Sequence, residues 1–337
     1  MSLSPKAAAR LAREAAVQRF APAARALNED WGTAYDGRQV QRWAERLGQG
    51  VVAQRQAELA ACEQGVRPRG PENDPPLLVI GLDGGRLQGR EKNLETGSRW
   101  KEDKVCTITS CRPGDGQDRP PQPLVTTCVA TMGDCRELGK LARLEAERRG
   151  IRQAAQTLVI GDGGNWIDPL QEEYFPRQVR ILDYYHAAEH LHEVARAVYP
   201  QTPARAQRLA DKLVTLLWRG QTPGLLKVLG ACARQLGPAH PDDGPEQPRR
   251  VVAQNLGYFQ KHREQMNYPE YRKRGWPIGS GITEAGVKQF NQRVKGTEQF
   301  WSHDGAEAIL ALRALWRSHD DRLTHYWLGP RPARKAA

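Results

Sequence analysis

The chain has 337 residues, with 50 Lys and Arg against 39 Asp and Glu, a formal net charge of +11 and a pI near 9.5. That length allows two domains or one large domain with an insertion, and the positive charge favours a polyanion such as nucleic acid as partner over an inert basic surface. No run approaches the roughly 20 apolar residues of a membrane span, and six scattered cysteines suit a reducing compartment. We therefore expect a cytoplasmic, nucleoid-associated protein.

Residues 1–70 are predicted to form a helical region, a candidate for a truncated helix-turn-helix DNA-binding part. The first 20 residues are amphipathic but carry Glu14 and lack an apolar signal core, which favours a surface helix over a targeting peptide. Val40, Trp43 and Leu47 indicate one face of a further helix. Arginines one turn apart form another stripe, which either enters a DNA groove or is solvated: Arg38, Arg42 and Arg46. The Pro- and Gly-rich segment 66–76 is a predicted linker.

Strand and helix patterns then follow one another in a recognisable order. Three strands are predicted first, then a helix, a strand, a short helix, a strand and a helix. This order is typical of a ribonuclease H-like α/β domain, a mixed sheet flanked by helices; a plain doubly wound nucleotide-binding sheet is the alternative. The segments are LLVIGLDGG, KVCTITS (104–110), PLVTTCVATM (123–132), 134–149, TLVIGD, WIDPLQEEYF, VRILDYY and 187–198.

Leucines at helical spacing predict an all-helical insertion at 201–266. The catalytic core is then expected in two parts, 77–200 and 267–328, of which the second supplies a helix at 282–295 and a final helix. A long excursion between the two parts is tolerable because the entropy of loop closure grows only logarithmically with loop length.

Three acids stand at element boundaries: Asp83 after LLVIGL, Asp162 after TLVIG, and Glu284 at the start of a helix. In α/β sheets, ligands gather at the carboxyl ends of strands. Carboxylates that converge from different elements can hold two divalent cations about 4 Å apart, which is the arrangement of a two-metal phosphodiester site. The Asp-Gly-Gly sequences also have a purely structural reading, because glycine serves tight turns in many folds.

The helix that carries Glu284 has two faces. Val287, Phe290 and Val294 are predicted to pack on the sheet. A polar stripe follows the other face and would place lysines along a phosphate backbone: Glu284, Lys288, Asn291 and Lys295. The alternative is an ordinary helix ion pair between Glu284 and Lys288, which contributes only about 0.3 kcal/mol.

His186, Glu189 and His190 form a competing H-x-x-E-H pattern, the inverted zinc-peptidase signature. Zinc hydrolysis requires a third, distal ligand. It would also leave the two Asp-Gly-Gly strand ends without a role. These histidines are otherwise helix residues beside a polar site, since short motifs often match by chance.

Over residues 77–328 the sequence resembles insertion-sequence transposases of the DDE type, close to the ISKra-type group. The resemblance rests on the motifs GDGGNWIDPLQEEYFPRQVRILDYYHAAEHL, PIGSGITEAGVKQFNQRVKG and FWSHDGAEAILALRAL, and on a late Tyr326-Trp327. It matches Asp83, Asp162 and Glu284 to the metal-binding acids, and Asp183 and His186 to an Asp-x-x-His pair. This chain departs from the pattern at Gly164 and Asp168.

The resemblance implies DNA strand cleavage and strand transfer with two Mg²⁺ or Mn²⁺ ions, Asp83 bridging both. The expected partners are double-stranded DNA, as transposon ends and target, and further copies of the chain assembled on it. Expected DNA contacts combine basic side chains with one aromatic ring: Lys288, Lys295, Arg293, Arg272, Lys273, Arg274 and Trp301. A catalytically silent or domesticated DNA-binding remnant remains an alternative.

Overall fold

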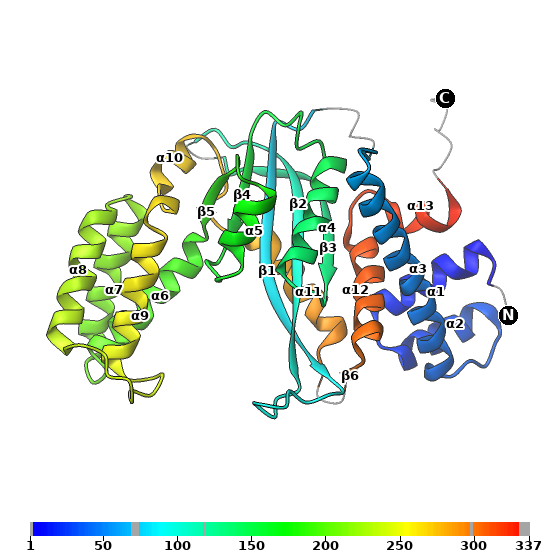
Figure 1. Ribbon diagram of the computed structural model, residues 1–337, viewed down its shortest axis with the longest axis horizontal. Coiled ribbons are helices and arrows are strands. Elements are labelled where there is room, and N and C mark those ends of the chain that lie inside the picture. Colours follow the sequence, from blue (N-terminus) through cyan, green and yellow to red (C-terminus); the bar gives the residue numbers. More distant parts are fainter. Residues whose placement is uncertain (1–2, 69–73, 117–118, 297–298, 330–337) are drawn as a thin grey trace.

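The computed structural model describes residues 3–68, 74–116, 119–296 and 299–329. Part of the predicted linker, 69–73, lies outside the described residues. The molecule is elongated, with a central sheet between a group of N- and C-terminal helices on one side and a lobe of helices on the other (Figure 1).

A six-stranded mixed sheet has the order β3-β2-β1-β4-β5, and β6 pairs with β1 outside this path. β1 is antiparallel to β2 and parallel to β4, while β4 and β5 are parallel. An antiparallel meander followed by two parallel strands is the ribonuclease H-like topology, so the predicted fold class is confirmed and the doubly wound alternative is wrong. The strands are Leu77–Gly89, Trp100–Arg112, Gln122–Thr131, Thr157–Gly161, Val179–Leu182 and Phe300–Trp301.

Two predicted strand ends need correction. β1 does not close at Asp83 but continues to Gly89, because β2 pairs with it as far as Gln88. Its pairing with β4, however, stops at Leu82 opposite Gly161, so Asp83 does lie where the parallel neighbour ends. β5 stops at Leu182, since the Asp183 carboxylate accepts a bond from the His186 amide and begins a helix.

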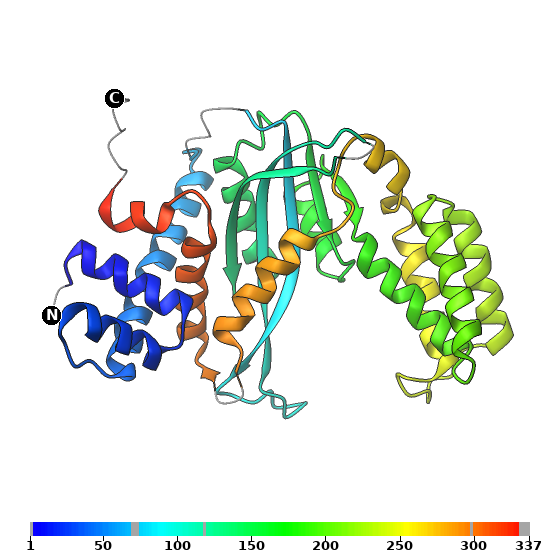
Figure 2. The same ribbon diagram turned by 180° about the vertical axis from the view of Figure 1, so that it is seen from behind.

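Helices cover both faces of the sheet. α4 (Cys135–Arg148) and α5 (Ile167–Tyr174) lie on one face, and α11 (Gly281–Val294) crosses the other (Figures 1 and 2). Val287, Phe290 and Val294 of α11 are buried in one cluster with Leu87 and Val105 of the sheet, as the apolar stripe predicts. This packing fixes which side of α11 faces outward.

The N-terminal helices are part of the same hydrophobic cluster. α1 (Pro5–Val17), α2 (Phe20–Trp31) and α3 (Gly37–Glu63) pack with α12 (His303–Arg317) and α13 (Arg322–Leu328). The predicted surface helix α1 buries one face completely, including Leu11 and Ala12. The stripe of Arg38, Arg42 and Arg46 on α3 is exposed, while Val40 is buried.

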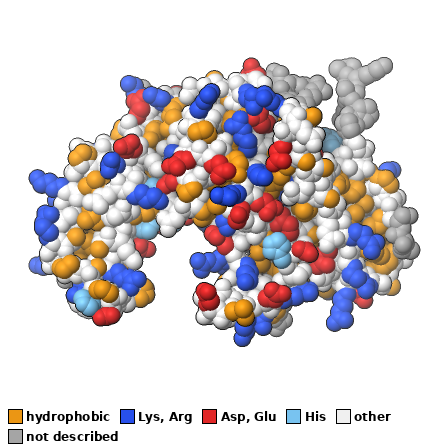
Figure 3. Space-filling model, viewed as in Figure 1, with side chains coloured by type: hydrophobic (Ala, Val, Ile, Leu, Met, Phe, Trp, Pro, Cys, Tyr) orange, Lys and Arg blue, Asp and Glu red, His pale blue; other side chains and the backbone are white. Residues whose placement is uncertain are grey.

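α6 (Tyr184–Val198) leads from the sheet to a lobe of three helices, α7 (Pro203–Trp218), α8 (Thr222–Leu236) and α9 (Pro248–Lys261). A hollow separates the lobe from the body of the molecule (Figure 3). Asp168 of α5 holds α9 near the sheet, because it is ion-paired with Arg180 at 3.4 Å and Lys261 at 3.2 Å.

The chain returns to the sheet through a 3₁₀ turn, Arg263–Gln265, and α10 (Tyr268–Lys273). The division into domains at 1–70, 77–200, 201–266 and 267–328 stays a prediction. Within the described ranges, no helix has both the length and the apolar character of a membrane span.

Candidate active site

Asp83, Asp162 and Glu284 come from three different elements at one end of the β1 and β4 pairing. Asp83 lies in β1 one residue beyond the last pair with β4, and Asp162 follows the last residue of β4. Glu284 lies in the first turn of α11, which packs on β1 and β2. The fold thus assembles the three predicted acids around β1.

The pKa of the Asp83 carboxyl group is raised. Burial raises its pKa most, the negative charges of Asp162 and Glu284 raise it further, and the Gly84 amide and His186 act in the opposite direction. The resulting pKa is about 6. A carboxylate that is partly dehydrated beside other negative charges is expected to favour a proton or a cation.

Glu284 is positioned through Ser280. The buried Asp183 carboxylate accepts bonds from both the backbone amide and the hydroxyl of Ser280. The Ser280 oxygen lies 3.2 Å from Oε1 of Glu284. Because Asp183 also caps α6, one side chain ties the start of α6 to the start of α11. These contacts suit Asp183 to a positioning role; its predicted supporting role stays a prediction.

Asp162 is held by its own loop and by the lobe. Its Oδ1 accepts a bond from the Gly164 amide at 2.9 Å, and its carbonyl accepts one from the Tyr258 hydroxyl of α9 at 2.8 Å. Gly163 has φ +84°, and a side chain there would collide with Leu182 and Tyr258. The structural reading of Asp-Gly-Gly thus holds at Gly163, and the functional reading of Asp162 stays a prediction.

The three acids offer the hard oxygen ligands that Mg²⁺ and Mn²⁺ prefer. One oxygen of each is already held by a local donor: the Gly84 amide at 2.6 Å, the Gly164 amide and the Ser280 hydroxyl. Among the described residues, no three His, Cys, Asp or Glu side chains are grouped closely enough to hold a metal ion. Like charges repel when no cation lies between them, so metal binding would require these side chains to turn toward one another.

The histidines of the H-x-x-E-H pattern have other partners. Nδ1 of His190 lies 2.8 Å from Oδ1 of Asn255, and its ring packs on Tyr258 at 4.4 Å. Burial lowers the pKa of His190. The His186 ring meets the His190 ring edge-on at 5.1 Å, and the Glu189 side chain is 77% exposed.

Two of the predicted DNA contacts are wrong because their side chains are buried. Arg293 is 1% exposed, its Nε donates to the Ala15 carbonyl at 2.7 Å, and burial lowers its pKa to about 9. Trp301 is 5% exposed and donates through Nε1 to the Val294 carbonyl at 2.8 Å. Both pack with Phe20 of α2, so neither faces a ligand in solvent.

The remaining basic candidates lie at the surface. Lys288 is exposed on α11, and its Nζ lies 3.9 Å from Oε2 of Glu284, so the predicted alternative of a helix ion pair is present. Lys295 is exposed just after α11 and lies over the Trp100 ring at 5.4 Å. Lys273 and Arg274 are exposed on and just after α10, whereas Arg272 is half-buried. Asn291 of the predicted polar stripe turns inward, with a buried Oδ1 that faces the backbone of Gly85.

Sequence reasoning missed Ser280, Tyr258 and Asp103. Ser280 has a local signal, because it precedes Glu284 by one helical turn. Tyr258 and Asp103 have none. Asp103 is fully buried on β2, both its oxygens approach Gly85 as does Asn291, and burial raises its pKa to about 6.

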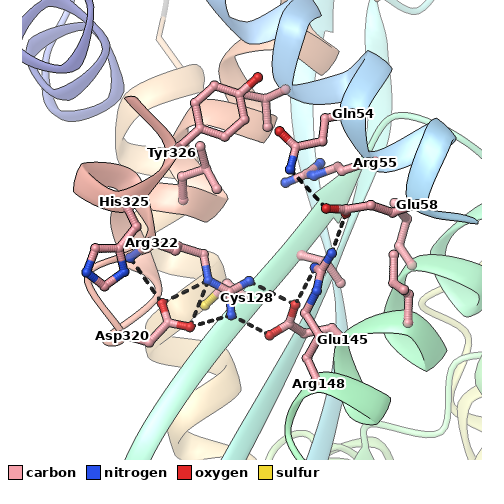
Figure 4. A pocket seen from close by; sticks show the side chains of 15 residues that line it. Gln54, Arg55, Glu58, Cys128, Glu145, Arg148, Asp320, Arg322, His325 and Tyr326 are labelled. Atoms are coloured by element: carbon pink, nitrogen blue, oxygen red, sulfur yellow. Dashed lines mark hydrogen bonds and ion pairs between the residues drawn. The ribbon is translucent and has the colours of Figure 1, made fainter. Parts of the chain in front are cut away.

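A cavity of about 340 Å³ lies away from the three acids, between α3, α4 and α13 (Figure 4). The acids that line it pair with arginines. Both oxygens of the buried Glu145 accept bonds from Arg322, at 2.6 and 2.8 Å, and Arg148 joins Glu145 to Glu58. We interpret this network as structural, since it joins the N-terminal and C-terminal helices to α4.

Residues 146–327 match the model of the Uncharacterised protein family (UPF0236), and the chain belongs to this family. No curated protein matches the sequence. Among solved structures, the chain is similar to the Drosophila P element transposase strand transfer complex, with 11% sequence identity over 96% of this chain and 94% of that chain. The TM-score of 0.40 is too low for this likeness to bear on function.

Proposed function

We propose that this UPF0236 member is a DDE-type DNA transposase of the ISKra-type group, which cleaves DNA strands at transposon ends and joins them to target DNA. The observation that carries the proposal is the electrostatic state of Asp83. Its pKa is about 6 because burial and the charges of Asp162 and Glu284 act on one carboxyl group. A buried acid with a perturbed pKa beside further acids is typical of functional sites.

Asp83, Asp162 and Glu284 would hold Mg²⁺ or Mn²⁺. A bound pair of such ions supplies activation of a water or 3′-hydroxyl nucleophile and stabilisation of the leaving oxygen. The chain itself orients these acids: Asp183 and Ser280 fix Glu284, and Tyr258 fixes the Asp162 backbone. The charge of His186 acts on Asp83 and lowers its pKa. His186 is therefore suited to orienting a carboxylate or a phosphate. Assembly of several copies on DNA belongs to the same proposal.

Nicking of supercoiled plasmid in Mg²⁺ or Mn²⁺ tests the proposal. Asp83→Asn, Asp162→Asn and Glu284→Gln should each abolish nicking while DNA binding persists, because the acids act as a unit. Glu189→Gln is the matched control, since it removes an exposed acid of the neighbouring helix. A variant that retains activity within about tenfold, or about 1.4 kcal/mol, removes that residue from the catalytic set.

The same experiment separates the alternatives. A wild-type protein that binds DNA but nicks none, in either metal, would be a silent DNA-binding remnant. Purified protein that carries stoichiometric zinc, lost in His186→Ala and His190→Ala, would instead be a zinc hydrolase.

A further inference from the structure

Two exposed aromatic rings lie near the start of α6 and at the end of α7. Tyr185 of α6 is 61% exposed and Trp218 of α7 is 43% exposed. Both meet the ring of Tyr184 edge-on, with centroids at 5.4 and 5.3 Å, and Tyr184 itself is almost buried. The exposed rings therefore flank one anchored ring, although they come from different helices.

Tyr185 is seated directly next to the residues that position Glu284. The first atom of a side chain at Gly279 would lie 2.5 Å from two carbons of the Tyr185 ring, so the ring covers the Gly279 backbone. Gly279 precedes Ser280, whose hydroxyl oxygen lies 3.2 Å from the Glu284 carboxylate. Part of the Tyr185 ring is thus covered by backbone, while 61% of the side chain stays exposed.

A cation accompanies Trp218. The Arg272 guanidinium lies 3.5 Å from the centre of the Trp218 ring, and both its terminal nitrogens donate to the Trp218 carbonyl at 3.1 Å. Arg272 is thereby fixed in a stacked position. Lys273 and Arg274 follow it in sequence and are exposed. Arg274 is paired with Glu270 at 2.8 Å. Aromatic rings next to cations match the two parts of a nucleotide, a flat base and a phosphate.

We propose that Tyr185 and Trp218, with Arg272, form a stacking site for an unpaired DNA nucleotide next to the Asp83, Asp162 and Glu284 cluster. Bases inside a duplex present mainly their edges, so a base covers a free aromatic ring most readily where a strand is unpaired. The exposed lysine and arginine after Arg272 would meet the adjoining phosphates. This inference rests on the proposed function, since it names the form of DNA that the same site takes.

Binding of labelled duplexes in EDTA, where no cleavage occurs, tests the inference. A duplex with a short unpaired 3′ extension is compared with a blunt duplex of equal paired length and with one whose extension is abasic. The wild type should prefer the natural extension. Tyr185→Ala should weaken binding of the extended duplex about tenfold and leave blunt binding unchanged, while Tyr185→Phe keeps the ring and should bind as the wild type does.

Equal affinity of wild type and Tyr185→Ala for the extended duplex, or equal affinity of wild type for natural and abasic extensions, would overturn the stacking site. Asp83→Asn should keep the preference, because the rings lie outside the acid cluster. A preference that depends on Tyr185 in a protein that nicks no DNA would keep the stacking site and reject the transposase. Nicking that depends on Asp83, without any preference for the extended duplex, would keep the transposase and reject the stacking site.

Discussion

Glu145 and Asp83 are acids taken out of water in two regions of the molecule, and their pKa values move in opposite directions. Burial alone would raise the pKa of Glu145, yet the charge and hydrogen bonds of Arg322, with Arg148, hold it at about 2. Burial raises the pKa of Asp83 to about 6, and the neighbouring acids add to the effect. Near Glu145 the fold supplies cations, whereas near Asp83 it supplies further anions.

This difference separates a structural acid from a candidate metal ligand. The Glu145 network is complete within the chain, since Arg322 occupies both carboxylate oxygens. The Asp83 cluster gathers negative charge, of which only the part on Glu284 is met by an exposed lysine of the described residues, Lys288, at 3.9 Å. A divalent cation would neutralise more of it. A substitution at Glu145 can therefore be compared with one at Asp83.

Glu145→Gln should have the largest effect on stability. It leaves Arg322 and Arg148 without the buried carboxylate that both contact, and the free energy of unfolding should fall by about 3 to 5 kcal/mol. Denaturant unfolding near pH 7 measures the change. Glu58→Gln is the matched control, because Glu58 contacts Arg148 in the same network but its side chain is 32% exposed, and it should cost about 1 kcal/mol or less. Equal losses in the two variants would contradict a special role for Glu145.

Asp83→Asn should instead stabilise the protein while it abolishes cleavage. The folded-state pKa of Asp83 is raised from 3.8 to about 6, so above pH 6 the folded protein carries a charge that unfolding would relieve. Removing that charge should raise the free energy of unfolding at pH 8 by up to about 3 kcal/mol. Denaturant unfolding at pH 8 compares the variant with the wild type.

The stability difference between Asp83→Asn and the wild type should depend on pH. As pH falls through 6 toward 3.8, the folded Asp83 takes up its proton first, so the advantage of Asp83→Asn should shrink and disappear. Glu145 has the opposite sign: its contribution is present above pH 4.5 and is lost as pH falls toward about 2. An advantage of Asp83→Asn that is the same at pH 8 and pH 4.5 would refute the assigned pKa.

Mg²⁺ should stabilise the wild type by a smaller amount. A ligand that binds only the folded state adds about 1.4 kcal/mol at ten times its dissociation constant. The unfolding midpoint should therefore rise with Mg²⁺ in the wild type and in Glu58→Gln, but not in Asp83→Asn. A rise of equal size in Asp83→Asn would place the ion elsewhere, whether or not the protein cleaves DNA.

The sequence predicts the ribonuclease H-like sheet and the positions of the acids because these depend on local patterns. Apolar runs that end in Asp-Gly place Asp83 and Asp162 at neighbouring strands, and the stripe of Val287, Phe290 and Val294 orients the helix of Glu284. Burial of Arg293 depends instead on a carbonyl 278 residues away, that of Ala15. Trp301 is buried because β6 pairs with the far end of β1. No local sequence pattern indicates the contact of Arg293 with Ala15 or the pairing of β6 with β1.

The smallest effect is expected on DNA affinity, from the exposed lysines on and just after α11. Unlike the buried Arg293 of the same helix, these lysines can contact a phosphate. Each lysine that contacts a phosphate releases about one counterion on binding, so Lys288→Ala with Lys295→Ala should lower the slope of log affinity against log salt by nearly two. Lys227→Ala, on α8 of the lobe, is the control and should leave the slope unchanged. Fluorescence anisotropy of a labelled duplex at several salt concentrations measures the slope. An unchanged slope in the double variant would make Lys288 and Lys295 a solvated face and would place the DNA path along α10 and the aromatic rings of α6 and α7.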